Sequence, residues 1–177
     1  MGRCRAGWLI TVCAAVAACA TPLIEQQGPV YSIEVPGTTL VFEFPSDGFE
    51  LEVSDNNPPY YYFTNQRSKL NLSFSFERAT KCNSSEACRD YFANEFSKAD
   101  TSRENWRPAR IAEVFVSESQ DSSAGSSGEK QQFMNAHFLK DGMWVNVRLS
   151  KADYRDGDRE LFVKLVRFIQ FWPKIRE

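Results

Sequence analysis

Apolar and polar residues alternate through much of the segment between Tyr31 and Phe76, which predicts a series of short β-strands. The predicted strands cover residues 31–35, 40–44, 49–53, 60–64 and 70–76. Turn-forming residues such as Pro36-Gly37 separate these strands. Each strand is therefore expected to bury one face and to turn the other toward solvent or a covering element.

Two later segments change to the helical period of about 3.6 residues. The first covers residues 83–98, where Asn83 and Glu86 have the spacing of a capping box. The second covers about residues 157–170, with Asp156 as its candidate N-cap. Each segment carries one apolar stripe, so both helices are expected to pack against the sheet.

The strongest local signal is a β-hairpin over residues 131–150, which follows a predicted strand at 110–118 and a Ser- and Gly-rich loop at 119–130. Asp141-Gly142 is a two-residue hairpin turn. Its register places Met134, Ala136, Phe138, Val145, Val147 and Leu149 on a core face. The opposite face mixes aromatic and hydrogen-bonding groups, and is the possible partner-binding face: Asn135, His137, Trp144, Asn146 and Arg148.

The aromatic run from Tyr60 to Phe63 requires an explanation, because consecutive strand residues point to opposite faces. One interpretation is that helices cover both faces of the sheet. The other is an exposed aromatic surface, formed by Tyr61 or by Tyr60 and Tyr62 together with Trp144, that suits a protein or glycan partner.

These elements predict an α+β fold, in which a mostly antiparallel, twisted sheet packs against helices. The chain has 177 residues and is 42% hydrophobic, which suits one compact domain over residues 31–177. Residues 20–30 contain Pro, Gln and Gly, so residues 19–30 are interpreted as a tether.

Residues 1–18 resemble a secretory signal peptide, with Arg3 and Arg5 before an apolar run that is too short to span a bilayer. The end of the run, Val16-Ala17-Ala18-Cys19, resembles a bacterial lipobox and makes Cys19 the candidate lipidation site. Ala18-Cys19-Ala20 also fits an ordinary signal peptidase, so both types of cleavage stay open.

The cysteine count favours lipidation. Cys4 and Cys13 leave with the leader, and a lipid on Cys19 leaves the even pair Cys82 and Cys88. A local disulfide between these two suits an oxidising compartment. A metal site is the weaker interpretation because no His lies near them, so no metal and no cofactor are expected.

Charge excludes one class of partner. The net charge is −2, and it becomes −4 when Arg3 and Arg5 are removed with the leader. Because no basic excess is available to neutralise phosphates, a nucleic-acid partner is not expected. A membrane association would come from the lipid anchor rather than from basic residues.

Candidate catalytic chemistry is sparse. His137 is the only imidazole, and no carboxylate or nucleophile is expected beside it on its face of the hairpin. The acidic run from Asp153 to Glu160 breaks the order of a calcium loop and suits a helix N-terminus instead. These observations predict a protein that is not an enzyme.

The order of elements, and the segment Phe42-Glu43-Phe44-Pro45-Ser46-Asp47-Gly48-Phe49, resemble the PsbP-like fold, which small bacterial lipoproteins of the DcrB type share. The resemblance covers about residues 31–173 and implies an α/β/α sandwich. It also implies a protein that binds partners rather than one that catalyses a reaction. No binding residue of that family can be assigned to this chain.

We therefore expect a non-catalytic envelope lipoprotein that acts as a protein-binding or accessory module facing the periplasm. Ala20 after Cys19 resembles the sorting pattern for the outer membrane. Two alternatives stay open at this point. One is an immunity or inhibitor lipoprotein that blocks a toxin in the periplasm, and the other is a hydrolase.

Overall fold

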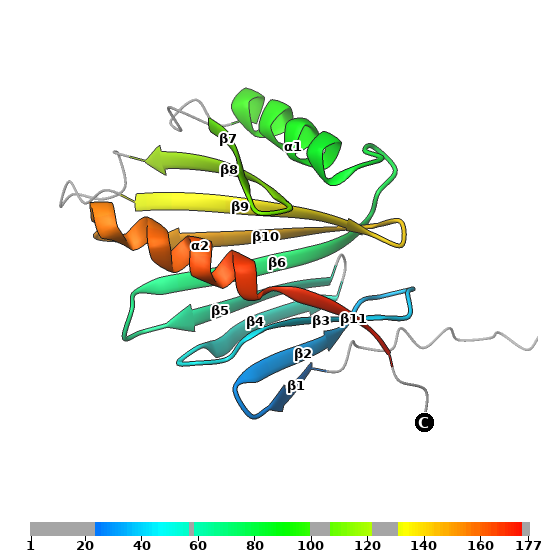
Figure 1. Ribbon diagram of the computed structural model, residues 1–177, viewed down its shortest axis with the longest axis horizontal. Coiled ribbons are helices and arrows are strands. Elements are labelled where there is room, and N and C mark those ends of the chain that lie inside the picture. Colours follow the sequence, from blue (N-terminus) through cyan, green and yellow to red (C-terminus); the bar gives the residue numbers. More distant parts are fainter. Residues whose placement is uncertain (1–23, 57–58, 100–106, 122–130, 175–177) are drawn as a thin grey trace, which may run out of the picture.

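The computed structural model describes residues 24–56, 59–99, 107–121 and 131–174. The predicted signal peptide, the lipidation site Cys19 and most of the loop at 119–130 lie outside these residues. Within them, the chain forms two antiparallel sheets and two α-helices (Figure 1).

The small sheet has four strands in the order β1-β2-β3-β11. Its strands are β1 (Ile24–Gln27), β2 (Val30–Glu34), β3 (Leu40–Pro45) and β11 (Gln170–Pro173). The last strand joins the sheet because the chain becomes extended at Ile169, after the second helix ends. The C-terminal segment therefore closes the small sheet beside β3.

The large sheet has seven strands in the order β4-β5-β6-β10-β9-β8-β7. Its strands are β4 (Glu50–Asn56), β5 (Pro59–Asn65), β6 (Leu70–Arg78), β7 (Arg107–Ile111), β8 (Val114–Asp121), β9 (Gln131–Lys140) and β10 (Met143–Lys151). Every strand pair in it is antiparallel.

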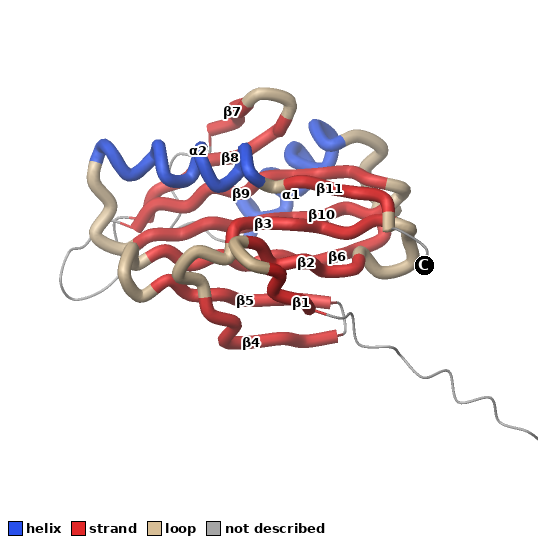
Figure 2. The backbone as a smooth tube through the Cα atoms, turned by 60° about the horizontal axis from the view of Figure 1, so that its bottom comes forward, coloured by secondary structure: helices blue, strands red, loops and turns tan. Residues whose placement is uncertain are grey.

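The main core lies between the two sheets, which form successive layers in Figure 2. Phe42 of the small sheet contacts Phe74 of the large sheet, with ring centroids 4.8 Å apart, and both side chains are buried. Phe44 and Phe63 make a similar contact at 5.0 Å. Successive side chains of a strand point to opposite faces of a sheet. The residues next to these core residues in the large sheet therefore lie on its outer face.

The two helices cover different faces. α2 (Arg159–Phe168) packs its buried residues Phe162, Val163 and Val166 into the main core, on the inner face of the large sheet. α1 (Ser85–Ala99) covers the outer face, where Phe92 packs with Trp144 in a separate cluster. The first layer is thus α1, the second is the large sheet, and the third contains the small sheet together with α2. This arrangement contains more sheet than a balanced α/β/α sandwich.

The predicted hairpin is confirmed. Phe138 pairs with Val145 and His137 pairs with Asn146, as the Asp141-Gly142 turn requires. Both turn residues have positive φ values, 48° for Asp141 and 73° for Gly142. These values match a type I′ turn, whose twist suits a two-residue hairpin.

Three boundaries differ from the sequence expectation. Residues 24–27, expected within the tether, form β1, because the turn at Gly28 (φ 60°) brings Ile24 opposite Ile33. The predicted strand at 110–118 is instead part of the β7–β8 hairpin, which turns at Ala112 with φ 52°. The second helix stops at Phe168 rather than at residue 170.

The helix starts also differ in detail. Ser84, not Asn83, caps α1, because its Oγ accepts a hydrogen bond of 3.0 Å from the Ala87 N–H. A short 3₁₀ helix, Asp156–Asp158, precedes α2. Asp158 of this segment forms an ion pair of 3.4 Å with Lys151, so part of the acidic run has a structural role.

The core covers only one face of the aromatic run in β5. Tyr61 and Phe63 are fully buried between the two sheets, whereas Tyr60 and Tyr62 lie on the outer face and Tyr60 is 37% exposed. The expectation that helices cover both faces is therefore wrong for this strand. The small sheet, rather than a helix, covers its inner face.

Candidate functional site

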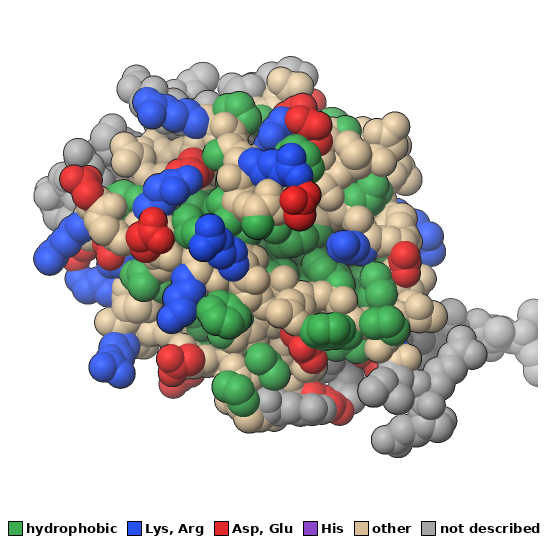
Figure 3. Space-filling model, viewed as in Figure 1, with side chains coloured by type: hydrophobic (Ala, Val, Ile, Leu, Met, Phe, Trp, Pro, Cys, Tyr) green, Lys and Arg blue, Asp and Glu red, His purple; other side chains and the backbone are tan. Residues whose placement is uncertain are grey.

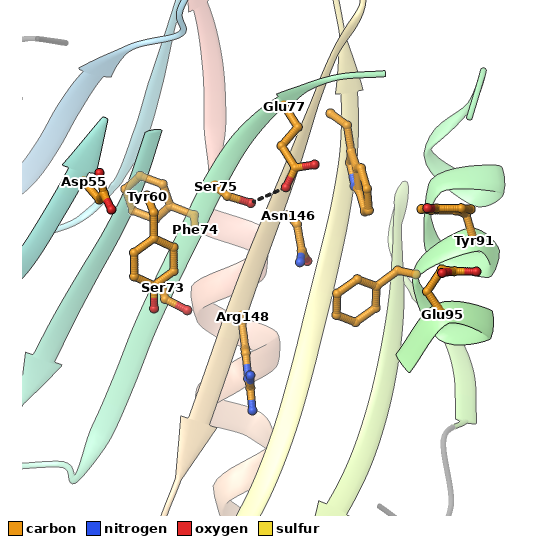
Figure 4. Close-up of a pocket in the computed structure, with 12 residues that line it drawn as sticks. Asp55, Tyr60, Ser73, Phe74, Ser75, Glu77, Tyr91, Glu95, Asn146 and Arg148 are labelled. Atoms are coloured by element: carbon orange, nitrogen blue, oxygen red, sulfur yellow. Dashed lines mark hydrogen bonds between the residues drawn. The ribbon is translucent and has the colours of Figure 1, made fainter. Parts of the chain in front are cut away.

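The outer face of the large sheet carries two adjoining cavities, which we call the outer-face trough. The first has a volume of about 530 Å³ and the second about 320 Å³. Tyr60, Ser73 and Arg148 line both cavities, so the trough is continuous across β5, β6 and β10. Figure 4 shows Tyr91 and Glu95 of α1 on one side of the first cavity, with Asp55 and Tyr60 on the other side.

Two contacts tie down the start of helix α1, whose later residues Tyr91 and Glu95 line the trough. Cys82, just before the helix, and Cys88, in its first turn, lie at disulfide geometry, with Cα atoms 4.9 Å apart. Ser85 Oγ accepts a hydrogen bond of 2.9 Å from the Leu139 N–H, which joins the helix start to β9. This cysteine pair was expected from the sequence, and it fixes where the wall begins.

Aromatic side chains make the apolar part of the first cavity. Trp144 packs edge-on against Tyr91 and Phe92 of α1, with ring centroids 6.1 and 6.3 Å apart. Tyr60 adds a partly exposed ring from β5. Partly exposed aromatic rings beside polar groups are typical of surfaces that bind proteins or glycans.

The charged side chains around the first cavity are mostly acidic. Asp55, Glu77 and Glu95 line it, and Arg148 is the single basic residue among the described side chains around it. Glu77 accepts a hydrogen bond of 3.5 Å from Ser75 Oγ, drawn as a dashed line in Figure 4. This balance favours a ligand that brings positive charge to the first cavity.

Two polar atoms of the trough have no hydrogen-bond partner among the residues that the structure describes. They are Nε1 of Trp144, which is 8% exposed, and Oδ1 of Asn146. An indole N–H can only donate and an amide oxygen can only accept. Because unpartnered buried polar atoms are costly, a ligand that accepts from one and donates to the other would stabilise the site.

The structure brings only part of the predicted partner-binding face to the trough. Asn146 and Arg148 line the trough and are half-buried. Asn135 and His137 are fully buried, and Trp144 is largely covered. Asn135 and His137 cannot contact a partner directly, because the outer face of β9 is covered and α1 packs over His137 through Phe92.

His137 occupies an enclosed position. Its Nε2 lies 3.5 Å from Ser117 Oγ, and its ring packs against Phe92 with centroids 5.0 Å apart. Burial, and secondarily the positive charge of Arg89, lowers the pKa of His137 from 6.5 to about 3. The ring is neutral at pH 7 and has no access to solvent, so it is a poor candidate for a catalytic base.

Several trough residues were not singled out from the sequence. Ser73, Ser75 and Glu77 lie on β6 opposite the hairpin strand β10, with Arg148 paired to Ser73. The alternation of β6 indicated that these residues share an outward face, but not which strand would lie beside them. Tyr91 and Glu95 lie on one face of α1, and only the docking of the helix brings them to the cavity.

Neither a metal cluster nor a membrane-spanning helix occurs in the part of the chain that the structure describes. No group of three or more His, Cys, Asp or Glu side chains there could hold a metal ion. Among the described helices, neither has the length and apolar character needed to cross a membrane.

No protein-family model and no curated protein sequence matches this chain. Its fold is similar to that of the Ran-binding protein Mog1p of Saccharomyces cerevisiae. The TM-score is 0.51 and the identity 11%, over 81% of this chain and 94% of that one. At this identity the likeness shows the fold alone.

Two other solved structures give a TM-score of 0.49, too low to support an argument. One is a Mog1 mutant, with 9% identity over 84% of this chain and 95% of that one. The other is a structure from Bacteroides thetaiotaomicron, with 13% identity over 82% of this chain and 48% of that one. The Mog1-like architecture is consistent with the PsbP-like fold that the sequence resembles, whereas the DcrB type is not shown.

Proposed function

We propose that the protein is a non-catalytic binding module of the bacterial envelope, which holds an extended segment of a protein partner in the outer-face trough. The carrying observation is the pair of unpartnered atoms, Trp144 Nε1 and Asn146 Oδ1, on neighbouring outward positions of β10. A peptide backbone supplies both a C=O acceptor and an N–H donor in every residue, so it can satisfy both atoms.

The shape and charge of the trough support this class of ligand. Two adjoining cavities that share Arg148 can receive successive side chains of one extended segment. The acidic first cavity favours a Lys or Arg side chain there, packed against the rings of Tyr60 and Tyr91. The second cavity is lined mainly by hydroxyl and amide groups and by Arg148, and favours a polar or acidic residue.

The similarity to Mog1p is compatible with this proposal. That protein is named for binding Ran, which shows that a fold of this kind can carry a protein-binding surface. The likeness does not identify the partner of this chain.

The anchoring part of the proposal rests on the sequence. A lipid on Cys19, five residues before β1, would hold the domain close to a membrane facing the periplasm, and Ala20 favours the outer membrane. Mass spectrometry of the native protein tests the lipid directly. An N-terminus at Cys19 without added lipid mass would contradict it. The immunity-protein and hydrolase alternatives stay untested predictions.

The binding test uses peptides selected from a random displayed library against the purified domain. We expect selected peptides to contain Lys or Arg, and Trp144→Phe to weaken their binding about tenfold, because it removes the N–H donor, together with part of the ring, while keeping an aromatic side chain. The matched control is Trp172→Phe on β11, whose exposed side chain lies on the small sheet. Equal affinity in both variants would contradict the assigned site.

A further inference from the structure

A second polar cavity lies on the inner face of the large sheet, near the start of α2 and on the other side of the sheet from the trough. Its volume is about 350 Å³. The side chains that matter for its chemistry come from β7, β8, β9, the segment leading into α2 and the first residue of α2: Arg107, Glu118, Gln132, Tyr154, Asp156 and Arg159. Neither the sequence expectations nor the proposed function uses this cavity.

Gln132 is the decisive residue. Its side chain is 5% exposed, lines the cavity, and has an Oε1 atom without a hydrogen-bond partner among the described residues. Its Nε2 makes only a long contact of 3.5 Å with the carbonyl of Phe133. Strand alternation puts Gln132 on the same face as Met134, whose paired neighbour Glu118 contacts α2. The unmet acceptor therefore points to a bound donor in this cavity.

The fixed charges of the cavity cancel one another. Arg159 holds Glu118 through two hydrogen bonds, from Nε at 3.0 Å and from an Nη atom at 2.6 Å. Arg107 and Asp156 are exposed at the rim and have opposite signs. Figure 3 shows the same mixture on the face that carries α2, where blue and red side chains are interspersed. A ligand with strong net charge is therefore not favoured.

Tyr154 supplies an aromatic wall. Its ring is half-buried and packs against Phe162 of α2, with centroids 6.2 Å apart. Burial and the nearby Glu118 carboxylate raise the pKa of Tyr154, so its hydroxyl stays protonated and can donate as well as accept. The ring face can pack against C–H groups, while amide, hydroxyl and guanidinium groups surround the same space.

We propose that this cavity binds a neutral, polyhydroxylated small molecule of the size of a monosaccharide. Sugar hydroxyls donate and accept, which matches an unmet amide acceptor beside tyrosine and arginine donors. The volume falls within the range of small-molecule sites, about 300–1,000 Å³. The affinity is expected to be weak, because the cavity is open and few of its groups are desolvated.

The test titrates the purified domain with D-glucose and with N-acetyl-D-glucosamine, followed by ligand-observed NMR, with sodium acetate and sodium phosphate as anionic probes. We expect millimolar binding of at least one sugar. Gln132→Met, which replaces the unpartnered amide by an apolar chain of similar length, should weaken that binding at least about fivefold and leave the melting temperature unchanged or raised. Gln131→Met is the matched control, one residue away and lining the trough instead.

Each remaining outcome would overturn the proposal. The first is that neither sugar binds to the wild-type domain. The second is that sugar binds equally to the wild-type and Gln132→Met domains. The third is that acetate or phosphate binds in place of the sugars. If Gln132→Met does not fold, the side-chain amide signals of the wild-type protein decide. Sugar must shift the signals of Gln132 and not those of Gln131. Peptide binding in the trough is measured separately, so either proposal can fail without the other.

Discussion

Arg148 lies over the ring of Phe133, with its guanidinium carbon 4.5 Å from the ring centroid, at the place where the two cavities of the outer-face trough join. The contact holds Arg148, the one basic side chain that the described residues bring to the first cavity, at the boundary with the second. The charge pattern along the trough therefore depends on the position of one side chain.

Opposite charge changes should move peptide affinity in opposite directions. Glu77→Gln is expected to weaken binding of Lys-containing peptides about two- to fivefold at low salt, because it removes negative charge from the first cavity. Arg148→Gln should strengthen the same binding. Fluorescence anisotropy at low and high salt measures both effects, which should shrink together as salt rises. A shift in the same direction for both variants would show that charge does not select the ligand.

His137 should make stability depend on pH. The unfolded chain binds a proton near the ordinary pKa of 6.5, whereas the folded protein binds it only near pH 3. The free energy of unfolding should therefore fall as pH decreases through this window, by about 1.4 kcal/mol per pH unit from this group. Urea unfolding of the wild type and His137→Gln between pH 4 and 7 measures the difference, which should be nearly flat above pH 6.5.

The same prediction has a check that does not need a variant. The chain has one His, so its imidazole NMR signals need no separate assignment. They should show no protonation of the folded protein at pH 4.5. Titration with a midpoint near 6.5 would contradict the enclosed position of this ring beneath α1.

The Cys82–Cys88 pair should matter more to α1 than to the rest of the fold. The bond closes a short loop, with a sequence separation of 6, so Cys82→Ser with Cys88→Ser should lower the free energy of unfolding by only about 2 kcal/mol. Amide exchange in the first turns of α1 should rise, while exchange in β9 and β10 should change little. Uniformly faster exchange in all three elements would argue against a local role.

Two glycines with positive φ should differ in their response to alanine. A Cβ at Gly48 would lie 2.8 Å from Nδ2 of Asn65, which donates to the Asp47 carbonyl, whereas a Cβ at Gly142 meets nothing within 4 Å. Both changes strain the backbone, but only Gly48→Ala also displaces a buried amide. We expect thermal unfolding to show a loss for Gly48→Ala that exceeds the loss for Gly142→Ala by about 1–2 kcal/mol. Equal losses would show that Asn65 can move without cost.

The sequence predicted strands and the hairpin register well, because these depend on period-two alternation and on the local turn at Asp141-Gly142. It could not predict that the strands divide into two sheets, since nothing local shows that residues 170–173 pair with β3. Residues 24–27 were assigned to the tether for the same reason. Their partner strand lies beyond the turn at Gly28, and one apolar residue followed by three polar residues shows no alternation that would indicate a strand.

The candidate site was predicted only in outline. Asn146 and Arg148 lie on the outer face that the hairpin register predicted, but the burial of Asn135 and His137 depends on where α1 docks, a long-range contact that the sequence does not encode locally. Ser73 and Ser75 were missed, and they join Tyr60, which the sequence had named as a possible exposed aromatic residue, because β6 pairs with both β5 and β10. Pairings between distant strands therefore account for most of the residues that were missed.

The most direct test of the trough is site-specific photocrosslinking in cells that produce the protein. Tyr60, exposed at the trough, is replaced by p-benzoylphenylalanine, and the same replacement at Trp172, exposed on the small sheet, is the control. We predict a discrete protein adduct from position 60 that disappears when Trp144→Phe and Asn146→Leu are added, and no such adduct from position 172. An adduct that survives those changes, or equal adducts from both positions, would contradict the account.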